Sequence, residues 1–406
     1  MHRHRQLSIF AVVFIDLLGF GLILPLLPYY AETFDASSTV VGLLIASYSA
    51  AQLIGAPLLG RLSDRFGRRP VLMASIFGTL IGFLMLGFAN SLLILFASRL
   101  LDGLTGGNIS VARAYIADIT DEDNRARGMG LIGAAFGLGF VIGPAAGGML
   151  SAGERYALPA FVAAGLAVFN LIAVYLWLPE SLDAARRAEL RASGRGSFSR
   201  ASLRDALARP GVGAILKMSF LYGLGFATFE GVFSLYAQKH LDLASDQTGY
   251  LLAYVGVLVA FIQGGAIGRL SRRFREERLI LSAAAILVPS LLAWAYAPNV
   301  LAVMVILAPV ALSLGVLSAT IHSVLTKAVL QEEVGGVLGL SSALGSTTRI
   351  IGPLTGAALL DVLGTWAPGV LSAGLMVVLW WYARRIFVTQ SHLAPAVYLE
   401  GEQTPV

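Results

Sequence analysis

The chain alternates long apolar runs with short polar segments. Runs of about 20 residues that carry few charges are long enough to cross a bilayer as α-helices, and they are too continuous for the strands of a membrane barrel. We therefore predict an all-α membrane protein with twelve transmembrane helices. The expected spans are residues 7–28, 40–60, 71–89, 92–117, 127–151, 157–178, 212–238, 248–270, 279–296, 300–327, 336–360 and 366–386.

The short polar connections differ in charge, and the difference predicts their side of the membrane. The segment 60–70 contains Arg61, Arg65, Arg68 and Arg69, whereas the segment 29–39 contains acidic residues and no Lys or Arg. Basic residues concentrate in cytoplasmic loops of membrane proteins. With both termini in the cytoplasm, most of the 29 Lys and Arg lie on the cytoplasmic side.

Composition supports this reading and excludes several functions. The 406 residues are 57% hydrophobic and 13% charged, with a mean hydropathy of +0.77, which is too apolar for a water-soluble domain. The net charge of +5 follows from the basic loops, so no nucleic-acid partner is expected. A polytopic membrane enzyme is disfavoured, because the chain has no Cys, no His-rich cluster and no Gly-x-Ser-x-Gly motif. We expect no catalytic or metal site and no cofactor.

Two motifs recur, which indicates two related halves. The string GRLSDRF at 60–66 returns as GRLSRRF at 268–274, and IGPAAG at 142–147 returns as IGPLTG at 351–356. Parallel repeats of six helices, with a site near the midplane of the bilayer, are one established plan for secondary transporters. We predict two pseudo-symmetric six-helix bundles, with an N-terminal bundle at 1–178, a cytoplasmic linker at 179–211, a C-terminal bundle at 212–387 and a disordered cytoplasmic tail at 388–406.

The chain resembles the major facilitator superfamily, and within it the drug:proton antiporters, including the tetracycline efflux proteins. The hairpin pattern G-x-x-x-D-R-x-G-R-R and the segments 16–25, 99–107, 115–118 and 137–148 carry this resemblance. It implies a monomer in the bacterial inner membrane that contacts lipid and exports amphipathic small molecules by alternating access, driven by the proton gradient. A proton-coupled transporter of a metabolite, sugar or lipid in the same fold is the alternative. Val259 and Leu287 stand near positions where tetracycline proteins carry His or Asp, so tetracycline itself stays open.

The basic hairpin and the Gly-Pro motifs are the predicted conformational gate. The resemblance implies that Asp64 caps the start of the helix at 336–360, and that an arginine such as Arg68 reaches Asp118. Glycines at close spacing let helices approach, and proline removes a backbone donor and bends its helix. The remaining predicted gate residues are Gly60, Arg65, Gly67, Arg69, Gly143, Pro144, Gly147, Gly352 and Pro353.

Charges inside the apolar spans are the predicted proton-coupling groups, because such charges are costly in a membrane. We expect Asp16 to carry the coupling proton or to share it with Asp102, and Arg99 and Glu230 to take part. Glu230 is predicted to pair with Arg349. Two structural alternatives remain: Asp16 accepts hydrogen bonds that bend its helix, and Arg99 and Asp102 neutralise each other.

Polar and aromatic side chains within the spans are candidates for a substrate cavity, since such walls suit bulky amphipathic molecules. In an apolar chain the aromatic residues equally serve to pack helices, and Arg113 equally extends to the membrane surface. The candidates are Gln52, Asn108, Arg113, Tyr222, Phe226, Phe229, Tyr236, Gln263, His322 and Arg349.

Overall fold

The computed structural model describes residues 2–120, 122–183, 187, 200–329 and 333–389. Within these ranges the regular structure is helical throughout, with no β-strand. Ten helical segments of the described chain, two of which join consecutive helices, are long and apolar enough to span a membrane. The predicted all-α membrane fold is therefore confirmed.

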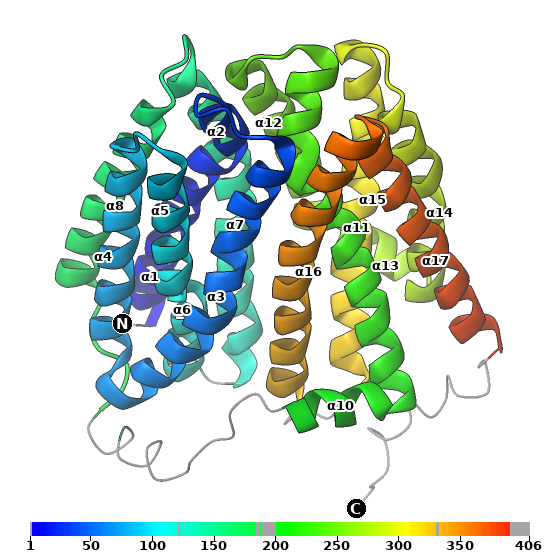
Figure 1. The fold of residues 1–406 in the computed structure, drawn as a ribbon. Helices are drawn as coiled ribbons and strands as arrows, with labels where there is room; N and C mark the ends of the chain where they lie inside the picture. Colours follow the sequence, from blue (N-terminus) through cyan, green and yellow to red (C-terminus); the bar gives the residue numbers. More distant parts are fainter. Residues whose placement is uncertain (1, 121, 184–186, 188–199, 330–332, 390–406) are drawn as a thin grey trace, which may run out of the picture. The chain divides into compact units, whose positions relative to one another are not determined.

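Figure 1 shows the helices in chain order. Their bounds are α1 His2–Ile23, α2 Leu27–Glu32, α3 Ser38–Phe66, α4 Arg68–Gly87, α5 Leu92–Thr105, α6 Asn108–Ile119, α7 Glu122–Ser151, α8 Ala157–Trp177, α10 Arg200–Ala208, α11 Pro210–Leu241, α12 Ser245–Phe261, α13 Ile267–Arg273, α14 Glu276–Ala295, α15 Val300–Lys327, α16 Val334–Leu363 and α17 Ala367–Thr389.

The predicted spans 248–270 and 336–360 are helical as well, although they are not among the ten segments that are long and apolar enough to span a membrane. The first is interrupted, because α12 ends at Phe261 and a π-helical turn, η2 at Ile262–Ala266, separates it from α13. The second lies in α16, which is 30 residues long but includes Arg349 and Pro353.

Two further spans that the sequence predicts as continuous helices are broken. The first span consists of α1, a 3-10 turn at Leu24–Leu26 and the short α2. Pro25 and Pro28 lie at this junction and lack the backbone N–H groups that a regular helix needs. The fourth span is broken at Gly106 and Gly107, between α5 and α6.

Contacts divide the chain into two units. Unit 1 comprises Met1–Arg195 and Phe233–Val257, and unit 2 comprises Gly196–Val232 and Leu258–Val406. The two divisions within α11 and α12 have no counterpart in the predicted bundles. The domain bounds 1–178, 179–211, 212–387 and 388–406 stay a prediction, and much of the linker and all but the first two residues of the tail lie outside the described residues.

Each unit is held together by helix pairs. In unit 1, α1 packs against α7, α3 against α5, and α4 against α8. In unit 2, α14 packs against both α15 and α17. Large apolar side chains such as Phe77, Phe169 and Trp381 remain exposed on these helices, as expected for surfaces that face lipid instead of water.

Candidate functional site

A buried ion pair lies at the centre of the polar groups in unit 1. Arg99 and Asp102 stand three residues apart on α5, and Nη1 of Arg99 lies 3.3 Å from Oδ2 of Asp102. Their exposed fractions are 1% and 3%. The Arg99 guanidinium also lies over the ring of Phe83, 5.9 Å from its centroid. The alternative in which the two charges neutralise each other is thus present in the structure.

Asp16 on α1 belongs to the same cluster. It interacts electrostatically with Asp102 and accepts a hydrogen bond from the side chain of Asn108 on α6. The side chain of Thr79 on α4 donates to Asp102. Four helices therefore contribute to a single group of two carboxylates and one guanidinium.

The arginine of this cluster keeps one unused donor. Among the described residues, Nη2 of Arg99 is buried and has no hydrogen-bond partner. A buried donor without a partner costs free energy and calls for an explanation. The donor belongs to the guanidinium that pairs with Asp102, and Asp102 in turn interacts with Asp16.

The break between α5 and α6 positions Asn108. Because the helix stops at Thr105, the carbonyl of Gly106 lacks a helical partner, and Nε2 of Gln52 donates to it at 2.8 Å. The same amide nitrogen lies 3.1 Å from the hydroxyl of Tyr48. Gln52 thus stabilises the break, after which α6 begins with Asn108 directed to Asp16.

A second polar cluster lies in unit 2. Glu230 on α11 interacts electrostatically with Arg349 on α16 and with Tyr222, which lies about two turns earlier on α11. The hydroxyl of Tyr222 contacts the side chain of Ser318 and donates to the carbonyl of Leu314 at 3.3 Å. The sequence-predicted partners Glu230 and Arg349 are therefore brought together.

The predicted cavity residues have different surroundings. Phe229 forms an edge-to-face contact with Trp294 at 4.8 Å, and Tyr236 stacks on His240 at 4.8 Å. Phe229 and Tyr236 are buried, which favours the packing alternative for both. Tyr222 and Phe226 stack along one face of α11, with 6.2 Å between centroids.

Three further candidates are less informative. His322 is exposed, and its Nδ1 lies 2.8 Å from the carbonyl of Ser318 on its own helix. Arg113 is exposed on α6. The side chain of Gln263, in the π-helical turn, lies outside the described part of the chain.

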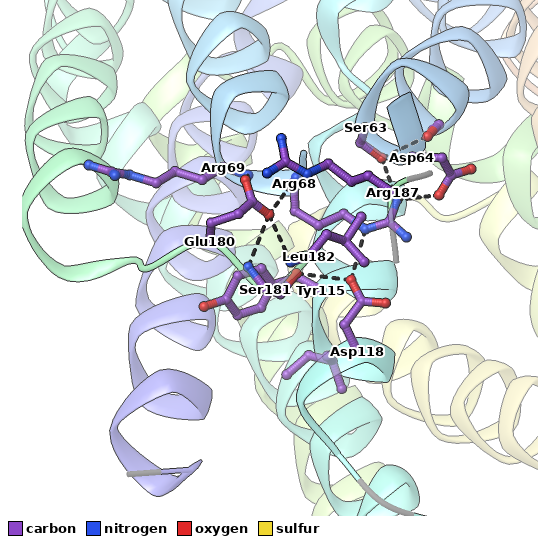
Figure 2. A network of polar contacts seen from close by, with 12 residues as sticks. Ser63, Asp64, Arg68, Arg69, Tyr115, Asp118, Glu180, Ser181, Leu182 and Arg187 are labelled. Atoms are coloured by element: carbon purple, nitrogen blue, oxygen red, sulfur yellow. Dashed lines mark hydrogen bonds and ion pairs between the residues drawn. The ribbon is translucent and has the colours of Figure 1, made fainter. Parts of the chain in front are cut away.

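The basic hairpin forms a network centred on Arg68, which is only 5% exposed (Figure 2). Nη1 of Arg68 lies 2.6 Å from Oδ1 of Asp64 and 2.6 Å from the hydroxyl of Ser63. Nε of Arg68 donates to Oδ2 of Asp118 at 2.9 Å, so the expected contact between Arg68 and Asp118 is present. The predicted cap of Asp64 on the start of α16 would join the two units and stays a prediction.

Glu180 completes this network, and the sequence analysis missed it. Its Oε1 accepts backbone hydrogen bonds from Arg68 at 2.9 Å, Ser181 at 3.0 Å and Leu182 at 3.1 Å, and its Oε2 accepts one from Arg69 at 3.2 Å. The carboxylate thereby satisfies the free N–H groups at the start of α4. The available signal was an acidic residue directly after an apolar span.

Gly67 is explained by the same contact. Its φ of +107° lies in the region that favours glycine, and a Cβ there would overlap the carboxylate of Glu180. At Gly60, by contrast, an added Cβ would meet nothing within 4 Å. Close packing therefore explains Gly67 and does not explain Gly60. Arg65 lies over the ring of Phe66, 5.3 Å from its centroid.

The Gly-Pro motifs make close helix contacts in both units. A Cβ on Gly143 would lie 2.7 Å from the Cα of Gly21 on α1, and one on Gly147 would overlap the carbonyl of Leu22. In unit 2, a Cβ on Gly352 would lie 2.7 Å from the backbone of Thr228. These positions need a residue without a side chain.

Prolines accompany both contacts. Pro144 lies inside α7, and its carbonyl approaches Gly249 on α12 within unit 1. Pro353 lies inside α16, where its ring would contact a Cβ on Gly231 at 2.6 Å. The motif is thus repeated in structure as well as in sequence.

The chain has the features of a membrane transporter: apolar spanning helices, charged clusters within them, and a basic network at the end of a helix hairpin. The sequence model of the Major Facilitator Superfamily matches residues 9–329, which is well over half of the chain. The chain belongs to this superfamily, whose members are transporters and not enzymes.

Several relatives match along most of their length. The tetracycline resistance protein, class C, of Escherichia coli is 35% identical over 359 residues, which cover 87% of this chain and 88% of that protein. Multidrug resistance protein 2 of Bacillus subtilis is 28% identical, covering 92% of this chain and 94% of its own. The crystal structure of the human organic anion transporter MFSD10 superposes with a TM-score of 0.70 at 26% identity, covering 94% and 99% of the two chains. The chain is an integral membrane protein.

Proposed function

We propose that this protein exports amphipathic small molecules in exchange for protons, by alternating access in a bacterial inner membrane. The observation that carries the proposal is the buried cluster in which Asp16 meets Asp102 and Asn108 beside Arg99. The similarity to tetracycline and multidrug resistance proteins supports the same function. The protein acts as a monomer with both termini in the cytoplasm, and the proton gradient supplies the energy without a cofactor.

Asp16 is the group that exchanges the proton in this proposal. Asp102 is already paired with Arg99, whereas Asp16 has an amide and a second carboxylate as its neighbours. A proton on Asp16 removes the repulsion between the two carboxylates, and its loss restores that repulsion. The Asp16 carboxylate then becomes a second possible partner for the buried guanidinium of Arg99, which links protonation to the position of α1.

The polar network of the hairpin is the cytoplasmic gate. Arg68 joins the end of α3 to the end of α6 through Asp64 and Asp118. In the closed cytoplasmic state Asp64 additionally caps the start of α16. The Gly-Pro contacts of α7 and α16 are where helices rock during the transition.

A second candidate is a proton-coupled transporter of a metabolite, sugar or lipid in the same fold. The interaction of Glu230 with Arg349 in unit 2 favours it, because such a pair suits a charged or zwitterionic head group. In the exporter proposal Glu230 and Arg349 contact the substrate beside Tyr222 and Phe226. The two candidates share Asp16 as the proton carrier.

Purified protein in liposomes tests the proposal. We expect an imposed pH gradient to drive uphill accumulation of at least one dye or drug, from a panel that includes tetracycline. The same panel contains sugars, amino acids and lipids. Accumulation of these alone would favour the second candidate, and accumulation of none under any gradient would contradict both.

A further inference from the structure

An apolar groove runs along the outside of unit 1 between α4 and α8. It has a volume of about 540 Å³ and is lined by Met73, Ala74, Phe77, Leu171, Ile172, Tyr175 and Leu176. Five of these residues are exposed: Ala74, Phe77, Ile172, Tyr175 and Leu176. Both helices are membrane spans, so the groove opens into the hydrocarbon of the bilayer.

Arg69 lies at one end of this groove. Its guanidinium is 5.4 Å from the centroid of the Tyr175 ring, and its Nη2 donates to the carbonyl of Tyr175 at 2.5 Å. Figure 2 shows the side chain directed away from the contacts of Arg68 with Asp64 and Asp118. Arg69 is the second residue of α4, where the span meets the membrane surface.

The guanidinium has hydrogen-bonding capacity to spare. An arginine has five N–H donors, and in the described part of the chain Nε of Arg69 is buried without a partner. Glu180 binds the backbone N–H of Arg69, and the described ion pairs include none to its side chain. The positive charge of Arg69 therefore lies at the membrane surface, at the end of the apolar groove.

We propose that the groove and Arg69 form a binding site for one anionic phospholipid. An acyl chain lies along the groove between α4 and α8, and the phosphate binds the guanidinium of Arg69. An apolar wall that opens to lipid and ends in a cation matches an acyl chain followed by an anionic head group. A small drug would match the wall but would leave the position of the charge unexplained.

The experiment uses wild-type protein in vesicles that contain phosphatidylglycerol and phosphatidylcholine. Each lipid in turn carries a photoreactive group in its acyl chain, and mass spectrometry locates the labelled peptides. One arginine at the membrane surface favours anionic lipid by about fivefold. We expect labelling of the peptides of α4 and α8 that line the groove to be about fivefold stronger with phosphatidylglycerol.

Three variants separate this site from general attraction to basic loops. Arg69→Gln removes the preference, and Arg69→Lys keeps it because the charge remains. Arg384→Gln is the matched control, since the guanidinium of Arg384 also lies over an aromatic ring, that of Trp380, at 5.2 Å from its centroid. We expect the Arg384→Gln control to keep the wild-type preference for phosphatidylglycerol over phosphatidylcholine at the groove.

The contrary outcomes are equally clear. Equal labelling by the two lipids, no labelling at the groove, or a preference that survives Arg69→Gln would overturn the proposal. Loss of the preference in Arg69→Lys or in the Arg384→Gln control would overturn it as well. Displacement of both lipids by a transported dye, without any preference between them, would identify the groove as a substrate site instead.

Discussion

Replacing Glu180 with alanine tests whether one carboxylate holds the hairpin together. The substitution removes the acceptor of four backbone N–H groups, two of which belong to the first two residues of α4, Arg68 and Arg69. Those groups have no partner within their own helix, because the start of a helix lacks the preceding turn. The other two belong to Ser181 and Leu182, directly after Glu180.

The size of the effect follows from these contacts. Loss of a capping side chain costs about 0.5–2 kcal/mol, and loss of a negative charge at a helix N-terminus costs a further ~0.3–1 kcal/mol. We expect local opening at the start of α4 to become easier by about 2 kcal/mol. Because each 1.4 kcal/mol is a factor of ten, opening becomes about thirtyfold more frequent.

Hydrogen exchange of the peptide 66–72, in purified protein, measures this opening directly. Glu180→Ala should speed exchange of the Arg68 and Arg69 amides about thirtyfold. Glu180→Gln is the matched control, because it keeps one carbonyl oxygen in place of Oε1 and should have a smaller effect. Exchange within about threefold of wild type in Glu180→Ala would refute the assignment of Glu180 as the cap of α4.

Three further outcomes are expected. Gly67→Ala should speed exchange of the same peptide, because its φ of +107° and the nearby carboxylate both exclude a Cβ; unchanged exchange would contradict this. Gly147→Val should lower thermal stability by several degrees through collision with α1, whereas Gly137→Val, where a Cβ meets nothing within 4 Å, should not; equal melting temperatures would exclude the close contact. Glu230→Gln and Arg349→Gln should each reduce stability more than the double variant, since either single change leaves a charge unpaired; a double variant no more stable than the singles would show that the two do not pair.

The spanning helices could be predicted because their signal is local. Length and apolarity of a run are enough to identify a span. The interruptions were missed, since a proline pair such as Pro25 and Pro28 is also tolerated in an unbroken membrane helix. The break at Gly106 and Gly107 depends on Gln52, 54 positions away, which supplies a donor to the freed carbonyl.

In the candidate site, too, the residues with a local signal could be predicted and those defined by distant contacts could not. Asp16, Asp102 and Arg99 stand out in sequence because each is a charge inside an apolar run. Glu180 does not, because it follows the span and its role depends on Arg68, 112 residues earlier in the chain. The contact of Arg68 with Asp118 was expected only through the resemblance to a known family.

Uphill transport by Asp16→Asn tests the central claim, that Asp16 exchanges the coupling proton. The variant keeps the size of the side chain and can still bind Asn108, but it cannot release a proton. Wild-type protein and the variant are reconstituted in the same liposomes with a fluorescent dye that the wild type accumulates. The account predicts that Asp16→Asn binds the dye and equilibrates it down its gradient, but loses accumulation driven by an imposed pH difference. Accumulation at the wild-type level by Asp16→Asn would contradict it.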